Sequence, residues 1–137
     1  MKAGNILADL PGRGPQECLE TLASSAGVRV ERIVSFGHAS PPGFWYDQPH
    51  PEWVMVVEGR AGLEVEGQRA IVDLGPGDYV DIPAHCRHRV AWTSPDGPTV
   101  WLAVQYGDVR GEGLTAVRSD ASTAVRSEAS TAVRSEA

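Results

Sequence analysis

Residues 52–88 read EWVMVVEGRAGLEVEGQRAIVDLGPGDYVDIPAHCRH, and this stretch decides the fold. Short runs in which apolar and polar residues alternate, such as EWVMVV and DYVDIP, are separated by turn sequences rich in Gly and Pro. Alternation with a period of two is typical of a strand with one buried face. Many short strands joined by such turns indicate a β-sandwich or a closed barrel.

The same pattern extends to both sides of this stretch. The strand-like runs are VRVERIVSF, EWVMVV, AGLEVEG, RAIVDL, DYVDIP, HRVAWT and TVWLAVQY. Further upstream the spacing changes. Pro15 suits the first turn of a helix, Cys18, Leu19 and Leu22 have helical spacing, and Gly27 suits a C-terminal cap. We therefore expect one short N-terminal helix before the strands.

The C-terminal part of the chain is a repeat. From Leu114 it reads LTAVRSDA, STAVRSEA, STAVRSEA and ends at Ala137. Eight residues at about 100° each turn about 80° past two full helical turns, so the single Val of each octad forms no continuous apolar seam. We therefore expect one folded domain over residues 1–113, and a flexible or weakly helical tail over 114–137.

Composition excludes several classes of partner. The 137 residues include 12 basic and 18 acidic side chains, a net charge of -6, which gives no electrostatic footprint for nucleic acid. No apolar run is long enough to span a membrane, and two cysteines make no disulfide framework, so we expect a cytoplasmic protein. The glycine clusters do not fit a phosphate-binding loop, so we expect no nucleotide cofactor.

Two motifs in this chain resemble those of the cupin superfamily. The first ends with a glutamate, six residues and a glycine, which Glu52 and Gly59 fit. The second runs from a glycine to a histidine around a central proline, and Gly77 and His88 mark its ends, although His85 stands where a glycine is usual. The resemblance covers about residues 37–106 and extends to small single-domain bacterial cupins that mostly lack an assigned reaction. It implies an all-β, antiparallel double-stranded β-helix (a jelly-roll barrel) that forms a homodimer.

Cupins usually hold a divalent metal with three histidines and one glutamate. The resemblance implies that Glu52 and His88 are two of these ligands. The paired histidines of the first motif fall at Tyr46 and Gln48, and a register shifted by one residue supplies no histidine either. His50 lies two residues before Glu52, so in an extended strand both side chains point to the same face.

The expected metal ligands are therefore Glu52, His88, His50 and Gln48. Two imidazoles and a carboxylate suit Fe(II) and related ions, so the candidates are Fe, Mn, Ni and Zn. Two alternatives stay open. Glu52 could be a buried, hydrogen-bonded carboxylate without a metal, and His50 could lie on a surface loop between its two neighbouring prolines.

Three further residues are expected to line a ligand pocket in the barrel. Tyr46 lies an even number of residues from His50 and Glu52, so in an extended strand its side chain points to the same face as theirs. Cys86 and Trp92 have the same relation to His88. An inward Cys86 thiolate would favour zinc. For any single tryptophan, core packing is the alternative to ligand stacking.

Three functional hypotheses follow from the pattern. The first is a barrel that binds a divalent metal or a small polar ligand in its interior, with no assigned reaction. The second is a metal-dependent enzyme of the dioxygenase or isomerase kind that uses Glu52 and His88. The third is a non-catalytic sensor or dimerising regulatory module.

Overall fold

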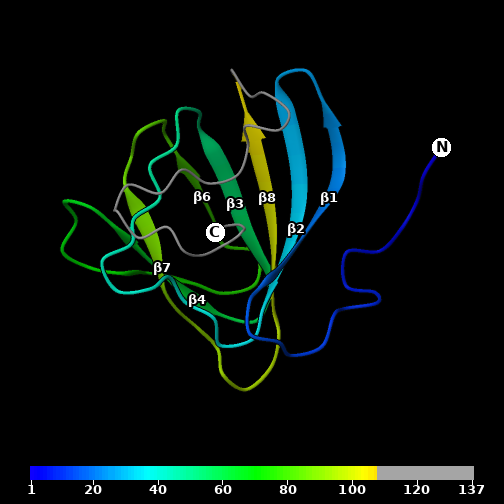
Figure 1. The fold of residues 1–137 in the computed structure, drawn as a ribbon, viewed down its shortest axis with the longest axis horizontal. Coiled ribbons are helices and arrows are strands. Elements are labelled where there is room, and N and C mark those ends of the chain that lie inside the picture. Colours follow the sequence, from blue (N-terminus) through cyan, green and yellow to red (C-terminus); the bar gives the residue numbers. More distant parts are fainter. Residues whose placement is uncertain (108–137) are drawn as a thin grey trace.

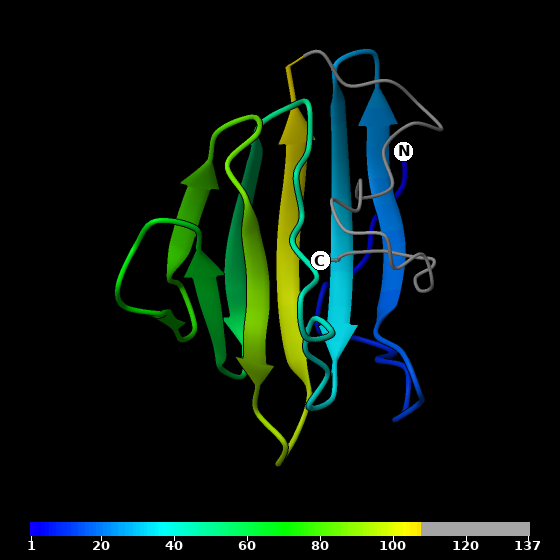
Figure 2. The ribbon, with the colours of Figure 1, turned by 60° about the vertical axis from the view of Figure 1, so that its left-hand side comes forward.

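Two antiparallel β-sheets face each other and enclose the core (Figures 1 and 2). The structure is a computed structural model, and it describes residues 1–107. The strands in this range are β1 (Cys18–Ser25), β2 (Val28–Ser35), β3 (Glu52–Glu58), β4 (Ala61–Val65), β5 (Val72–Leu74), β6 (Tyr79–Ile82), β7 (His88–Thr93) and β8 (Thr99–Tyr106).

The strand order puts the last strand in the middle of the larger sheet. That sheet has the order β1-β2-β8-β3-β6, and the smaller sheet has the order β5-β4-β7. Apolar side chains from both sheets form the core: Ile33, Val54, Val56, Ala61, Leu63, Leu74, Ile82, Val90, Trp101 and Ala103. The prediction of an all-β antiparallel fold is confirmed.

The predicted N-terminal helix is wrong, because residues 18–25 form strand β1. This strand pairs with β2 in a hairpin in which Ser25 lies opposite Val28. Gly27 has a φ of 84° in the turn, a conformation that glycine adopts readily both in tight turns and after helices. A helix this short gains little stability by itself, whereas pairing covers the backbone edge of β2 that would otherwise be open.

The predicted domain boundary at residue 113 and the octad tail lie outside the described residues. The part of the chain that the structure describes contains no helix, and so none that could cross a membrane.

The connection between β2 and β3 closes the side of the barrel next to β7. The Ser40 N–H donates to the carbonyl of Val90 at 2.8 Å, and Tyr46 and His88 exchange backbone hydrogen bonds of 2.7 and 3.2 Å. In Figure 2 this segment, coloured cyan to teal, runs lengthwise in front of the barrel. The residues just before Glu52 are therefore held against the first residue of β7.

Both motifs identified in the sequence contain a residue with a positive φ. Gly59 joins β3 to β4 at a φ of 90°, and a Cβ atom there would lie 2.6 Å from the Pro98 carbonyl oxygen. His85, at the position where the motif usually has glycine, has a φ of 59°. Its Nδ1 lies 3.0 Å from an Asp47 carboxylate oxygen. The motif glycine is thus explained by a left-handed turn, which His85 also adopts here.

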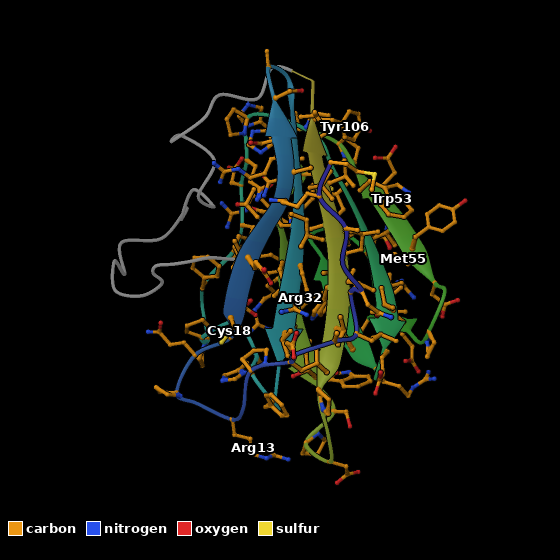
Figure 3. The ribbon with its side chains drawn as sticks, turned by 90° about the vertical axis from the view of Figure 1, so that its right-hand side faces the viewer. Arg13, Cys18, Arg32, Trp53, Met55 and Tyr106 are labelled. Atoms are coloured by element: carbon orange, nitrogen blue, oxygen red, sulfur yellow. The ribbon has the colours of Figure 1, made fainter. Side chains whose placement is uncertain are left out.

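The N-terminal segment packs on the outside of the larger sheet. The guanidinium of Arg32 donates to the carbonyl oxygens of Ile6 and Ala8 at 3.2 and 2.7 Å and forms an ion pair with Glu20 at 2.8 Å. Figure 3 shows this segment crossing the outer face of the sheet near Arg32. Its course brings residue 17 to the start of β1.

Candidate functional site

Polar side chains gather on the inner face at one end of the larger sheet. Residues directly opposite each other on paired strands point to the same face. Glu52 on β3 lies opposite Gln105 on β8, which in turn lies opposite Arg29 on β2. The next inward row contains Glu31 and Val54, and the row after it, with Ile33, Trp101 and Val56, is apolar. The barrel interior therefore has a polar end and an apolar middle.

Glu52 presents a buried carboxylate to this interior. It begins β3 and is held on both sides, by β6 and by β8, which leaves it 3% exposed. The imidazole of His88 lies beside this carboxylate, with its Nε2 3.7 Å from Oε1 of Glu52. That separation is too long for a hydrogen bond. Within the described residues no hydrogen bond to this carboxylate is formed.

His88 is oriented by its own strand. Its Nδ1 lies 2.8 Å from the carbonyl oxygen of Cys86, and because a carbonyl only accepts, Nδ1 carries the proton. The Tyr46 ring stacks on the imidazole with centroids 5.4 Å apart. These contacts turn Nε2 toward Glu52.

Gln48 is buried without satisfying its side-chain amide. It is 3% exposed, and neither Oε1 nor Nε2 has a hydrogen-bond partner among the described residues. Its backbone is well anchored, since its carbonyl accepts from the His85 N–H at 2.7 Å. A buried amide without partners lowers the stability of the fold at this position.

His50 is buried but bonds away from the Glu52–His88 pair. Its Nε2 hydrogen-bonds to Oε1 of Gln105, and the Gln105 amide donates to Glu31 at 3.0 Å. Glu31, 1% exposed, also pairs with Arg29 at 3.5 Å. His50 is therefore neither a surface residue nor placed beside the other expected ligands. Within residues 1–107 no group of three or more His, Cys, Asp and Glu comes close enough together to hold a metal ion.

The Glu52–His88 pair opens onto a cavity between the two sheets. The cavity measures about 20 Å³, close to the space that one water molecule needs, within a pocket of about 350 Å³ that includes its solvent-filled opening. The lining residues are Glu17, Ile33, Glu52, Val54, Leu63, Ile82, His88, Val90 and Trp101. A mostly apolar wall with a few convergent polar groups is the usual composition of a ligand site.

None of the three expected pocket residues is among those that line the cavity, and Tyr46 is buried against the imidazole of His88 instead. Trp92 is 37% exposed and its indole covers Gly62, because a bulge around Ala91 reverses the alternation that starts at His88. Cys86 is half-buried against the edge of the core. Burial, and secondarily the charge of Glu66, raise the pKa of its thiol, which favours the protonated form over a thiolate ligand.

Three polar residues of the interior were not foreseen. Glu31 and Gln105 occupy inward positions of β2 and β8. Alternation does not identify them, because both faces of VRVERIVSF and TVWLAVQY carry apolar residues. Glu17 gave no signal either, since it precedes the segment that was expected to be helical.

Comparisons with known proteins agree with this architecture. The family model described as the cupin domain matches residues 36–105. A solved structure from Ralstonia eutropha JMP134, provisionally assigned as a mannose-6-phosphate isomerase, is 56% identical with a TM-score of 0.76, covering 77% of this chain and 98% of that chain. No curated protein matches the sequence.

More distant structures share the fold alone. A cupin superfamily protein from Desulfitobacterium hafniense DCB-2 is 20% identical with a TM-score of 0.62, covering 77% of this chain and 92% of that chain. A protein from Thermus thermophilus is 18% identical with a TM-score of 0.65, covering 77% and 97%. The family model spans half of the chain and the Ralstonia structure is similar over nearly its whole length. This chain therefore belongs to the cupin family.

Proposed function

We propose that this small cupin barrel binds a small polar ligand in its interior, at Glu52 and His88. The observation that carries the proposal is the Glu52 carboxylate, which is 3% exposed, faces the cavity and has no hydrogen bond within residues 1–107. A buried carboxylate that accepts no hydrogen bond is disfavoured, so a ligand that donates hydrogen bonds to Glu52 would be stabilised there.

A thermal-shift screen with small metabolites tests this proposal, because a ligand that binds only the folded state raises Tm. We expect the shifts to disappear in Glu52→Gln and to shrink in His88→Asn. Glu58→Gln is the matched control, since it removes one charge at the exposed end of the same strand. A ligand whose shift survives in Glu52→Gln would place binding outside the barrel interior.

A divalent metal is the second candidate occupant, with Fe, Mn, Ni and Zn as the ions considered. The protonated Nδ1 of His88 leaves Nε2 as the nitrogen that would ligate, an arrangement common among metal-binding histidines. Glu52 would supply a carboxylate oxygen and Gln48 an amide oxygen. His50 would join this set only by leaving Gln105. A bound ion would act as a Lewis acid on a ligand carbonyl or hydroxyl.

Among the described residues, only two strong metal donors, Glu52 and His88, lie together. A catalytic zinc typically has three protein ligands, so this set lacks one. Elemental analysis of gently purified protein decides the matter. The metal hypothesis requires near-stoichiometric metal that is lost in Glu52→Ala and His88→Ala. Protein that stays metal-free and refuses added ions would exclude it.

An enzymatic role rests on the same two side chains. A carboxylate and an imidazole 3.7 Å apart could move a proton between neighbouring atoms of a small substrate, as aldose–ketose isomerisation requires. The name of the Ralstonia structure makes mannose 6-phosphate the first compound to assay. Turnover that vanishes in Glu52→Gln would establish isomerase activity, and absent turnover would leave ligand binding as the function.

A sensor or regulatory role would require the barrel to associate with a second copy of the chain. We propose a homodimer, and the outer face of the larger sheet offers a stacked pair, Trp53 and Tyr79, with centroids 5.4 Å apart and Tyr79 61% exposed. Sedimentation of the wild type and of Tyr79→Glu tests this. A monomeric wild-type protein would contradict the proposal.

A further inference from the structure

A second carboxylate, that of Glu17, enters the same cavity. Glu17 directly precedes β1 and is half-buried. The Ser35 hydroxyl donates to its Oε1 at 3.3 Å, and the Trp101 indole N–H donates to the Ser35 hydroxyl oxygen at 3.2 Å. These hydrogen bonds direct the Glu17 side chain toward the inner face of the larger sheet.

Glu17 and Glu52 reach the cavity from opposite ends. Ser35, the partner of Glu17, lies opposite Thr99 at the start of β8, whereas Glu52 lies opposite Gln105 near its end. These positions are six residue steps apart, which corresponds to about 20 Å along β8 at about 3.4 Å per residue. The two carboxylates therefore enter the cavity, called the interior slot below, beside different ends of β8.

The walls of the interior slot between the two carboxylates are apolar. Side chains from both sheets form them: Ile33, Val54, Leu63, Ile82, Val90 and Trp101. No Lys or Arg is among the lining residues, and His88 is the only basic group there. Proteins recognise phosphate with arginine, lysine or backbone N–H groups. The charge of the interior slot is therefore opposite to what a phosphate ester requires.

We propose that the interior slot selects slender organic cations, of the class of straight-chain aliphatic amines and diamines, and that Glu17 sets this charge preference. The inference rests on the interior binding proposed above and names its ligand class. Two carboxylates complement ammonium groups, and the apolar walls complement a methylene chain. An unbranched chain is also the narrowest form in which such a cation can enter from the solvent-filled opening, since the enclosed part of the cavity has room for about one water molecule.

A matched set of probes on the full chain tests the charge preference. Straight-chain diamines, diols and dicarboxylates of equal length are compared by calorimetry at low salt, with mannose 6-phosphate as a further anion. Trp101 lines the interior slot, so tryptophan fluorescence gives a local readout. We expect a diamine to bind at least about tenfold more tightly than the diol, and the anions not to bind.

Glu17→Gln separates charge from shape. Because Glu17 is half-buried, we expect the variant to lose about five- to tenfold in affinity for the diamine and to keep its affinity for the diol. Glu58→Gln, the exposed control, keeps both affinities. A dicarboxylate or mannose 6-phosphate that binds as tightly as the diamine would overturn the charge preference while interior binding stands. If no probe binds and no ligand emerges from the metabolite screen, both the inference and the proposed function fail.

Discussion

Replacing Gln48 with methionine should make the protein more stable. The Gln48 side chain is 3% exposed, and both of its amide atoms lack hydrogen-bond partners within residues 1–107. Burying an unsatisfied amide costs about 1–3 kcal/mol by protein substitution data. Methionine has a similar length and no such group, and the backbone hydrogen bond from His85 to the Gln48 carbonyl does not depend on the side chain.

We therefore expect Gln48→Met to raise the free energy of unfolding by about 1–3 kcal/mol. At about 4 °C or more per kcal/mol for a domain of this size, Tm should rise by roughly 4 °C or more. Urea denaturation with an unchanged m-value gives the free energy directly. Gln68→Met, at an exposed turn position, is the control and should change stability by less than about 0.5 kcal/mol.

The refuting result is a Gln48→Met protein that is less stable than the wild type by about 1 kcal/mol or more. The amide would then have a partner in solution that satisfies it, and the reasoning from an unsatisfied group would be wrong.

Three other substitutions or reactions test different parts of the structure. Gln105→Leu should lower the free energy of unfolding by about 2–4 kcal/mol in denaturant titrations, since it removes one hydrogen bond from a buried carboxylate and one from a buried imidazole; a loss below about 1 kcal/mol would refute the buried chain of hydrogen bonds. Gly59→Ala should lower the free energy of unfolding by about 3 kcal/mol or more, because the added Cβ would collide with the backbone at a φ of 90°. A variant with a Tm close to that of the wild type would contradict the turn geometry. Burial raises the pKa of Cys86, so less thiolate is present at a given pH, and mass spectrometry should find Cys86 alkylated more slowly than the exposed Cys18 at pH 8; equal rates would contradict the burial.

The sequence predicted the barrel well because alternation is a local property. Strands β3 and β7 show their buried face by alternation in their own residues, and the turn residues separate one strand from the next. The prediction of a helix for the segment containing Cys18 was wrong because the structure there depends on a neighbouring strand. The strand in this segment is mostly exposed and exists because β2 offers an edge to pair with, which no local pattern reveals.

The site was predictable only in part, because side-chain direction depends on irregularities of the strands. Glu52 and His88 came together as their motifs implied. Trp92 did not, because a bulge shifted its strand by one residue. The direction of the His50 imidazole depends on Gln105, far along the chain, and Glu17 enters the cavity from a segment without alternation.

The position of β8 has a consequence for how the chain folds as it is synthesised. This strand separates β2 from β3, so the larger sheet stays in two unconnected parts until residues 99–106 have left the ribosome. At about 5–20 residues per second, the hairpin of β1 and β2 waits several seconds with one edge of β2 unpaired. During that interval, an extended segment of another nascent chain can occupy the place of β8. The yield of folded protein should therefore depend on the speed of translation and on expression level, even when the finished protein is stable.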